Sequence, residues 1–314
     1  MNAKPPSDTP KGDRIAKVLA RAGLASRREA ERMIEAGRVR VNGDQILSPA
    51  LNVTETDKIT LDGNPVSEPE PPRMWLYHKP KGLVTTDRDE KDRGTIYDDL
   101  PEDMPRVMSI GRLDLNSEGL LLLTNDGGIK RKLELPATGW LRRYRARVNG
   151  RPSEAALEPL RQGITVDGEN FQPMTVTIDR QQGANAWLTI GLREGKNREI
   201  RRAMDFVGLS VNRLIRVSYG PFQLGELKPG EVEEIRRKIV RDQMGITLDD
   251  DSGTAVKKPK IVHRTSNRRK PGGMGGAGQP GRPVPKSADN PDAKPGAKPR
   301  AGPAAKKGPP KSRR

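Results

Sequence analysis

The sequence lacks cysteine altogether and is poor in histidine and in aromatic residues. Its 314 residues include two histidines and only 3% aromatic residues. Without cysteine there can be no disulfide and no thiolate metal site, and two histidines are too few for a histidine-rich metal centre. We therefore expect the protein to work without a bound metal.

Long apolar runs are missing as well. No run approaches the roughly 18 residues that a membrane-spanning helix requires. The first residues, MNAKPPSDTPKGD, have no apolar centre of the kind that a secretory signal peptide contains. These absences predict a soluble, cytoplasmic protein.

Basic charge, by contrast, is abundant and is concentrated near the C-terminus. The chain has 58 Lys and Arg against 41 Asp and Glu, a formal net charge of +17. Residues 255–314 hold 17 of these bases and two of the acids, so this segment carries +15 and residues 1–254 carry +2. Such a segment favours a polyanionic partner, and ribosomal or messenger RNA is the expected one. A purely solubilising extension is the alternative.

Two changes in composition divide the chain. NPVSEPEPPR has four prolines in ten residues, which is typical of an extended spacer. The C-terminal mixture of Pro, Gly, Ala and Lys has no hydrophobic periodicity and cannot bury a core. The predicted organisation is a disordered start at 1–10, a domain at 11–63, the spacer at 64–73, a second domain at 74–247 and a disordered basic tail at 248–314.

The first domain begins with two short helices. Asp13 is the expected cap of a helix that ends near Gly23. Ser26 and Glu29 have the spacing of a capping box, in which each residue bonds the backbone amide of the other, at the start of a second helix. A short strand and a turn at Asn42-Gly43 follow.

Basic residues occupy the outer faces of these two helices. Isolated charges of this kind usually form an ordinary solvated surface. Because two short helices share the excess, we interpret them as a surface that follows RNA phosphates. They are Arg14, Lys17, Arg21, Arg27, Arg28 and Arg32. The surrounding pattern, RIAKVLARAGLASRREAERMIEAGRVRVNG, resembles the small S4-like RNA-binding domain of ribosomal proteins and RNA-modifying enzymes.

The second domain mixes strands with few helices. Alternating apolar residues predict strands at 144–150, 175–179 and 186–192, and a hairpin around Asp167-Gly168. Residues 197–209 have helical spacing. Because the strands do not alternate regularly with helices, we expect an α+β domain with a mainly antiparallel sheet.

One acid in this domain lies beside an unusually apolar run. In GRLDLNSEGLLLLTNDG, Asp114 precedes four leucines, Leu120 to Leu123, which read as a strand buried on both faces. The carboxylate would then lie in a loop held by the rigid start of that strand. From the residues alone, a surface aspartate paired with Arg112 is the simpler interpretation.

A resemblance to a known family gives this acid a function. GRLDLNSEGLLLLTNDG resembles the signature of the RsuA-type pseudouridine synthases, whose invariant aspartate falls on Asp114. Three further segments resemble family motifs in the same order. They are KPKGLVTTDRDEKDRGTIYDDLP (79–101), LRRYRARV (141–148) and EGKNREIRRAMDFVGLSVNRLIRVSYGPFQL (194–224).

The resemblance implies roles for further residues. The family's active-site tyrosine falls on Tyr144, its basic residue on Arg201 and its pocket leucine on Leu214. Arg201 is the expected cation beside Asp114, since a nearby guanidinium keeps a partly buried carboxylate ionised. The basic residues that flank the motifs are expected to hold the RNA backbone. They include Arg112, Lys79, Lys196 and Arg198.

The implied reaction is the isomerisation of a uridine to pseudouridine in ribosomal RNA by a monomer, without a cofactor. Within the family, the closing motif and the basic tail most resemble the enzymes that modify 23S rRNA. Two alternatives stay open: the same chemistry on small-subunit rRNA, and a non-catalytic ribosome-assembly protein that uses this fold to bind RNA.

Overall fold

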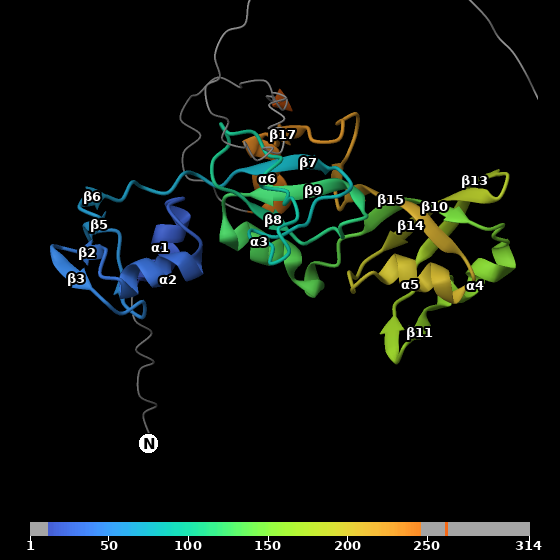
Figure 1. The fold of residues 1–314 in the computed structure, drawn as a ribbon, viewed down its shortest axis with the longest axis horizontal. Coiled ribbons are helices and arrows are strands. Elements are labelled where there is room, and N and C mark those ends of the chain that lie inside the picture. The colour runs from blue at the N-terminus through green and yellow to red at the C-terminus, as the bar shows by residue number, and fades with distance from the viewer. Residues whose placement is uncertain (1–11, 246–260, 263–314) are drawn as a thin grey trace, which may run out of the picture. The chain divides into compact units, whose positions relative to one another are not determined.

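The first domain is a small α+β unit built on a four-stranded antiparallel sheet. The computed structural model describes residues 12–245 and 261–262 of the chain. The four strands lie in the order β3-β2-β5-β6, and β1 pairs with β4. The elements, blue in Figure 1, are β1 (Asp13–Arg14), α1 (Ile15–Arg21), α2 (Arg27–Glu35), β2 (Val39–Val41), β3 (Asp44–Ile46), β4 (Asn52–Val53), β5 (Ile59–Leu61) and β6 (Asn64–Pro65).

The two helices of this domain begin differently. At α2 the capping box is present: the Glu29 amide donates to Ser26 Oγ at 3.2 Å, and the Ser26 amide donates to the Glu29 carboxylate at 3.4 Å. At α1 the prediction was wrong, because Asp13 lies in β1 and the N-cap is Arg14 without a side-chain cap. Asp13 instead accepts from Lys17 at 2.6 Å, one turn along the helix.

The second domain is organised around a ten-stranded sheet. Its main order is β13-β14-β10-β15-β9-β7-β17-β18, and the pairing is antiparallel except between β9 and β15. The predicted α+β class with a mainly antiparallel sheet is therefore confirmed. The ten strands of this sheet are β7 (Met74–Lys79), β8 (Met108–Ile110), β9 (Glu118–Thr124), β10 (Arg142–Asn149), β13 (Thr175–Gln182), β14 (Asn185–Leu192), β15 (Ser210–Tyr219), β16 (Phe222–Gln223), β17 (Val232–Glu234) and β18 (Ile261–Val262). β11 (Ile164–Val166) and β12 (Glu169–Phe171) form a separate two-stranded sheet.

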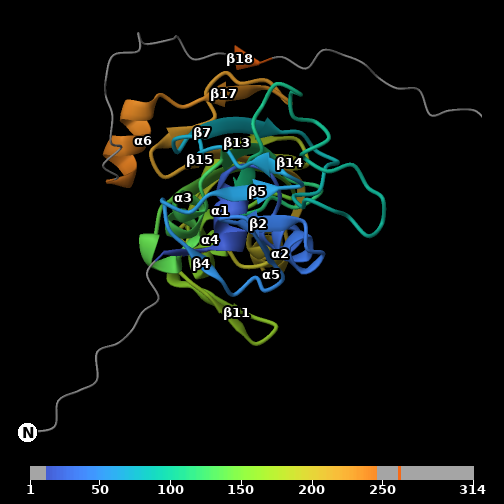
Figure 2. The same ribbon diagram turned by 90° about the vertical axis from the view of Figure 1, so that its left-hand side faces the viewer.

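Helices cover the two halves of this sheet separately. They are α3 (Gly127–Glu134), α4 (Glu154–Gln162), α5 (Glu199–Phe206) and α6 (Arg237–Met244), with a 3₁₀ turn at Pro136–Thr138. Residues of α4 and α5 pack with those of β10, β13 and β14, and Figure 1 shows both helices on the same side of these strands. Residues of α3 and α6 pack with β7 and β9. Figure 2 shows β17 beside β7, at the other end of the sheet.

Strand β9 is the centre of the second domain. All seven of its residues are buried. Leu121 and Leu123 join the cluster that contains α4 and α5, whereas Leu120 and Leu122 join the cluster that contains α3 and α6. The predicted strand buried on both faces is confirmed. Gly119 allows β9 to approach β15, since a Cβ there would lie 2.4 Å from a backbone oxygen of Arg216.

Two predicted boundaries need correction. β6 at Asn64–Pro65 pairs with β5, so the first domain includes residues that were assigned to the spacer. β18 at Ile261–Val262 pairs with β17 and lies within the tail that was predicted to be disordered. The predictions for residues 1–10 and for the rest of the tail concern positions outside the described residues. Among those described, no helix is long and apolar enough to span a membrane.

Candidate active site

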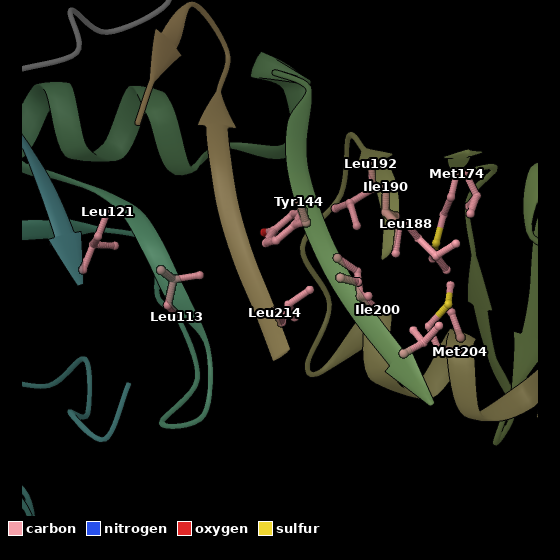
Figure 3. Packing of buried hydrophobic residues seen from close by; sticks show 14 of the residues in the cluster. Leu113, Leu121, Tyr144, Met174, Leu188, Ile190, Leu192, Ile200, Met204 and Leu214 are labelled. Carbon is pink, nitrogen blue, oxygen red and sulfur yellow. The ribbon is translucent and has the colours of Figure 1, made fainter. Parts of the chain in front are cut away.

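Four elements of the second domain bring the predicted site residues to one pocket. Asp114 lies in the loop before β9, Tyr144 on β10, Arg201 on α5 and Leu214 on β15, and all four line the same pocket. Tyr144 and Leu214 are both buried, and they lie on the same side of the sheet. Figure 3 shows these two side chains next to each other, with Leu113 on the far side of β15.

The loop that carries Asp114 is held by its carbonyl groups. Every carbonyl from residue 113 to residue 117 accepts a hydrogen bond from another segment. The donors are Thr85 Oγ1 to Leu113 (2.9 Å), Lys79 Nζ to Asp114 (3.2 Å) and Ser117 (3.0 Å), the Gly82 amide to Leu115 (2.8 Å) and Arg201 Nη2 to Asn116 (3.0 Å). Three of the four donors come from residues 79–85, which explains why this motif accompanies the aspartate.

Lys79 is part of this support and is not exposed to solvent. Its side chain is fully buried, and its ammonium also donates to the carbonyl of Pro80 at 3.1 Å. Burial lowers the pKa of Lys79 to about 8, while the charges of Asp114 and Glu118 oppose the shift. The prediction that Lys79 binds the RNA backbone was therefore wrong, because its charge is already satisfied by loop carbonyls inside the protein.

The Asp114 carboxylate is left available to a substrate. The residue is half-buried, and no described group donates a hydrogen bond to its carboxylate or forms an ion pair with it. The backbone of Asp114 is fixed, while its carboxylate has no partner among the described residues. This combination is expected of a group that must meet a substrate in one defined position.

Arg201 approaches the Asp114 loop through the backbone. Its Nη1 donates to the Val211 carbonyl at 2.9 Å and its Nη2 to Asn116, so it joins β15 to the loop. Within the described range no ion pair joins it to Asp114. Burial lowers the pKa of Arg201, and the negative charge of Asp114 opposes that shift. The expected electrostatic influence exists without a direct salt bridge.

Comparison with known proteins identifies the family. The model for RNA pseudouridylate synthases matches residues 73–205, and the S4 domain model matches residues 13–69. An uncharacterised RNA pseudouridine synthase of Rickettsia prowazekii is 45% identical over 231 residues, which cover 74% of this chain and 97% of the relative. The chain belongs to the RNA pseudouridine synthase family. It is an isomerase, and the non-catalytic alternative is set aside.

Two further proteins are similar to this chain. Ribosomal large subunit pseudouridine synthase B of Escherichia coli K12 is 37% identical over 258 residues, covering 79% of this chain and 89% of that protein. A crystal structure of a pseudouridylate synthase has the same fold, with a TM-score of 0.52, 24% identity and coverage of 73% of this chain and 98% of that one.

The other basic residues predicted to hold RNA in the synthase have different surroundings. Arg112 and Arg198 are exposed and line the pocket, so their charges face solvent. Lys196 also lines the pocket, but its ammonium forms an ion pair with Glu194 at 3.0 Å and donates to the carbonyl of Asn170. For Arg112 and Arg198 the contact with RNA stays a prediction that their exposure favours, whereas Lys196 already has partners within the protein.

Most of the predicted basic surface of the S4 domain is exposed to solvent. Arg14, Arg27, Arg28 and Arg32 are exposed. Lys17 and Arg21 instead approach Asp13, at 2.6 and 3.8 Å. Membership of the S4 family makes this domain an RNA-binding one.

One acid in the wall of the pocket was not predicted from the sequence. Glu199 is 4% exposed and accepts from the Lys196 amide at 2.9 Å through Oε2, while its Oε1 is buried without a partner. Burial raises the pKa of Glu199 to about 7, and the neighbouring Glu194 adds to the rise against the effect of the Lys196 amide. Helical spacing with Ile200 and Ala203 on the buried face was the signal that could have placed it inside.

Two more polar groups in the pocket wall lack a hydrogen-bond partner within the described part of the chain. Ser117 Oγ and Arg216 Nη2 are buried and have no partner among the described residues. Arg216 lies directly opposite Tyr144 in the strand register and donates to the Leu120 carbonyl at 2.7 Å. The part of the chain that the structure describes contains no group of three or more His, Cys, Asp or Glu residues suited to a metal ion.

Proposed function

We propose that this synthase converts a uridine of 23S ribosomal RNA to pseudouridine, with Asp114 as the catalytic carboxylate and without a cofactor. The observation that carries the proposal is the Asp114 loop, in which five consecutive carbonyls are bound while the carboxylate stays unoccupied in the pocket. The name of the Escherichia coli relative, a large-subunit enzyme, supports 23S rRNA as the substrate.

The reaction breaks the bond between N1 of uracil and the ribose, turns the base, and joins the ribose to C5, which loses its proton while N1 takes one up. No atom is added and no electron pair leaves the nucleoside, so an ionised carboxylate is sufficient in principle. Asp114 could attack the sugar, attack the base or remove a sugar proton. Carboxylates serve glycosidases in a comparable way, since the anomeric carbon becomes electron-poor when its bond breaks.

The neighbouring residues receive supporting roles in this proposal. The target nucleotide must leave the RNA stack, at a cost of a few kcal/mol. Tyr144 stacks on the extruded base and relays the proton that leaves C5, and Leu214 contacts the base beside it. Arg201 holds the loop and lends its positive charge to the site. Arg112 and Arg198 contact phosphates at the mouth of the pocket.

The proposal is tested with purified protein and full-length rRNA transcripts. The wild type should introduce pseudouridine at one position of 23S rRNA, detected by carbodiimide treatment and primer extension, and none in a 16S transcript. Asp114→Asn should introduce none while it binds the 23S transcript with unchanged affinity. A wild type that modifies only 16S rRNA would overturn the choice of substrate, and an active Asp114→Asn variant would overturn the role of Asp114. Because the protein is expected to act as a cytoplasmic monomer, the assay needs no partner protein.

A further inference from the structure

One face of the catalytic sheet is covered by helices and the other is not. Along β10, Tyr144, Ala146 and Val148 are buried, whereas Arg143 and Arg145 are exposed. The buried side packs with α4 and α5, and Figure 1 draws no helix on the opposite side of β10, β13 and β14. We call this opposite side, formed by the outward residues of β10, β13, β14 and β15, the open face.

A row of arginines crosses the open face. The strand register places Arg147 directly opposite Arg213 on one side and directly opposite Trp187 on the other, and Trp187 is opposite Arg180. Like charges directly across a strand pair destabilise a sheet. The repulsion between Arg147 and Arg213 is a cost to the sheet, and a negatively charged partner bound over both guanidinium groups would remove it.

The positive charge of the open face is only partly neutralised inside the protein. Arg213 forms an ion pair with Glu118 at 2.6 Å, and Arg145 lies 3.6 Å from Asp179. Among the described residues, no ion pair involves Arg143, Arg147 or Arg180. Five arginines against two acids leave this face with a charge of +3, and the partner that it fits is negatively charged.

An aromatic side chain lies among these arginines. Trp187 is half-buried, and the Arg145 guanidinium is 4.9 Å from its ring centroid. The nearby outward positions Thr175 and Thr189 are small and polar. An exposed sheet that combines an aromatic ring with arginines is the arrangement on which proteins stack single-stranded bases and bind the adjoining phosphates.

We propose that the open face is a further RNA-binding surface, besides the pocket and the S4 domain, which holds a single-stranded segment of the substrate RNA. A base stacks on Trp187, and phosphates contact Arg143, Arg147 and Arg180. The chain's own basic tail is not a suitable occupant, because residues 255–314 carry +15 and the open face is itself positive. An acidic peptide would satisfy the charge but not the stacking on Trp187.

The inference rests on the proposed RNA substrate but not on catalysis by Asp114. The pocket opens on the side of Tyr144 and Leu214, and the open face is on the other side of the same strands. Contacts there add affinity for RNA without touching the reacting nucleotide. Removing them should raise KM for a long rRNA substrate and leave kcat unchanged.

The test uses the full chain and the double variant Arg143→Gln/Arg147→Gln. Its binding to the 23S transcript is measured by fluorescence anisotropy at several salt concentrations. Loss of two phosphate contacts should lower the slope of log K against log salt by ~1.4, since each single-strand contact contributes about 0.7. Arg237→Gln/Lys238→Gln on α6 is the matched control, because it removes two exposed positive charges elsewhere. An affinity and slope equal to those of the control would overturn the proposal.

A second variant separates stacking from charge. Trp187→Ala should weaken RNA binding at every salt concentration without changing the slope, and Trp187→Tyr should restore most of the affinity. Circular dichroism checks that each variant is folded. If Trp187→Ala binds RNA as the wild type does, and only an acidic peptide binds this face, the RNA proposal is wrong and the partner of the open face is a protein. Because the readout is binding, a wild type that binds 23S rRNA without modifying it would overturn the proposed function and leave this test intact.

Discussion

The ammonium of Lys79 lies 3.2 Å from the carbonyl oxygen of Asp114, and the two residues come from different motifs, 35 positions apart. A buried cation thus supports the backbone of the proposed catalytic residue while the carboxylate faces the pocket. The contact gives the Lys-Pro-Lys-Gly segment a structural part in the site.

Replacing Lys79 with methionine tests this support. Methionine fills the space but removes one hydrogen bond from each of three carbonyls, of which only that of Asp114 keeps a second donor among the described residues, the Ser117 amide. We therefore expect a loss of about 1–3 kcal/mol in unfolding free energy at pH 7. Activity should fall as well, because the loop is less well fixed. Wild type and Lys79→Met are compared by urea unfolding and by a pseudouridine assay on the folded protein. An unchanged kcat would argue against a role of Lys79 in fixing the loop.

The same lysine predicts a pH dependence of stability. Its pKa is lowered by burial from 10.5 to about 8, so between these values the unfolded chain binds more protons than the native one. Stability contributed by this group therefore rises as pH increases from about 8 to 10.5. The difference in unfolding free energy between wild type and Lys79→Met should widen over this range. A constant difference would contradict the shift.

Glu199 gives the opposite trend at lower pH. Its pKa is raised from 4.5 to about 7, so the native state holds a proton that the unfolded chain has released. Stability from this group is complete below pH 4.5 and is lost as pH rises to about 7. Glu199→Gln imitates the protonated form and should exceed the wild type in stability by ~1–3 kcal/mol at pH 8 but not at pH 4.5. The exposed Glu226→Gln is the control, and both are measured by urea unfolding.

Arg201→Lys tests whether the guanidinium acts as a bridge. Arg201 bonds the carbonyls of Val211 and Asn116 through separate nitrogens, which the single nitrogen of lysine reproduces poorly. Since small displacements of a catalytic group are costly, kcat should fall roughly 10- to 100-fold, with little change in RNA affinity. Equal losses in affinity and kcat would instead point to a direct contact with RNA.

Tyr144 can be examined with two substitutions. Tyr144→Phe keeps the ring and removes the hydroxyl, so kcat should fall about 100-fold or more if the hydroxyl relays a proton, with unchanged affinity. Tyr144→Ala should in addition weaken binding of a target-containing RNA by ~1–3 kcal/mol through lost stacking. Full activity of Tyr144→Phe would remove the proton relay and leave stacking alone.

Local signals predicted much of the fold. The Ser26 and Glu29 capping box depends on residues three apart, and the Leu120–Leu123 strand on a continuous apolar run, so both were predicted from short stretches. Helix α4 was not predicted. It contains Pro159, which is normally unfavourable inside a helix, and is held by the Ser153 cap and by the burial of Leu157 and Leu160.

The site was predicted in part. Family motifs placed Asp114, Tyr144, Arg201 and Leu214, and the structure brings all four to one pocket. Their catalytic roles stay predictions. Lys79 was misplaced because a lysine next to proline resembles a surface turn, and only the folded sheet brings the carbonyls of residues 114 and 117 to its ammonium. No local pattern contains that information.

The binding of five consecutive carbonyls in the Asp114 loop has a consequence for substrate choice. A loop fixed along its whole length cannot adjust to a poorly placed nucleotide, so the RNA must supply the movement. Uridines in segments that bend and unstack at little cost should be modified readily, and the same base in a stiff helix should be passed over. Selection among the many uridines of an rRNA then depends on how easily each one leaves its neighbours.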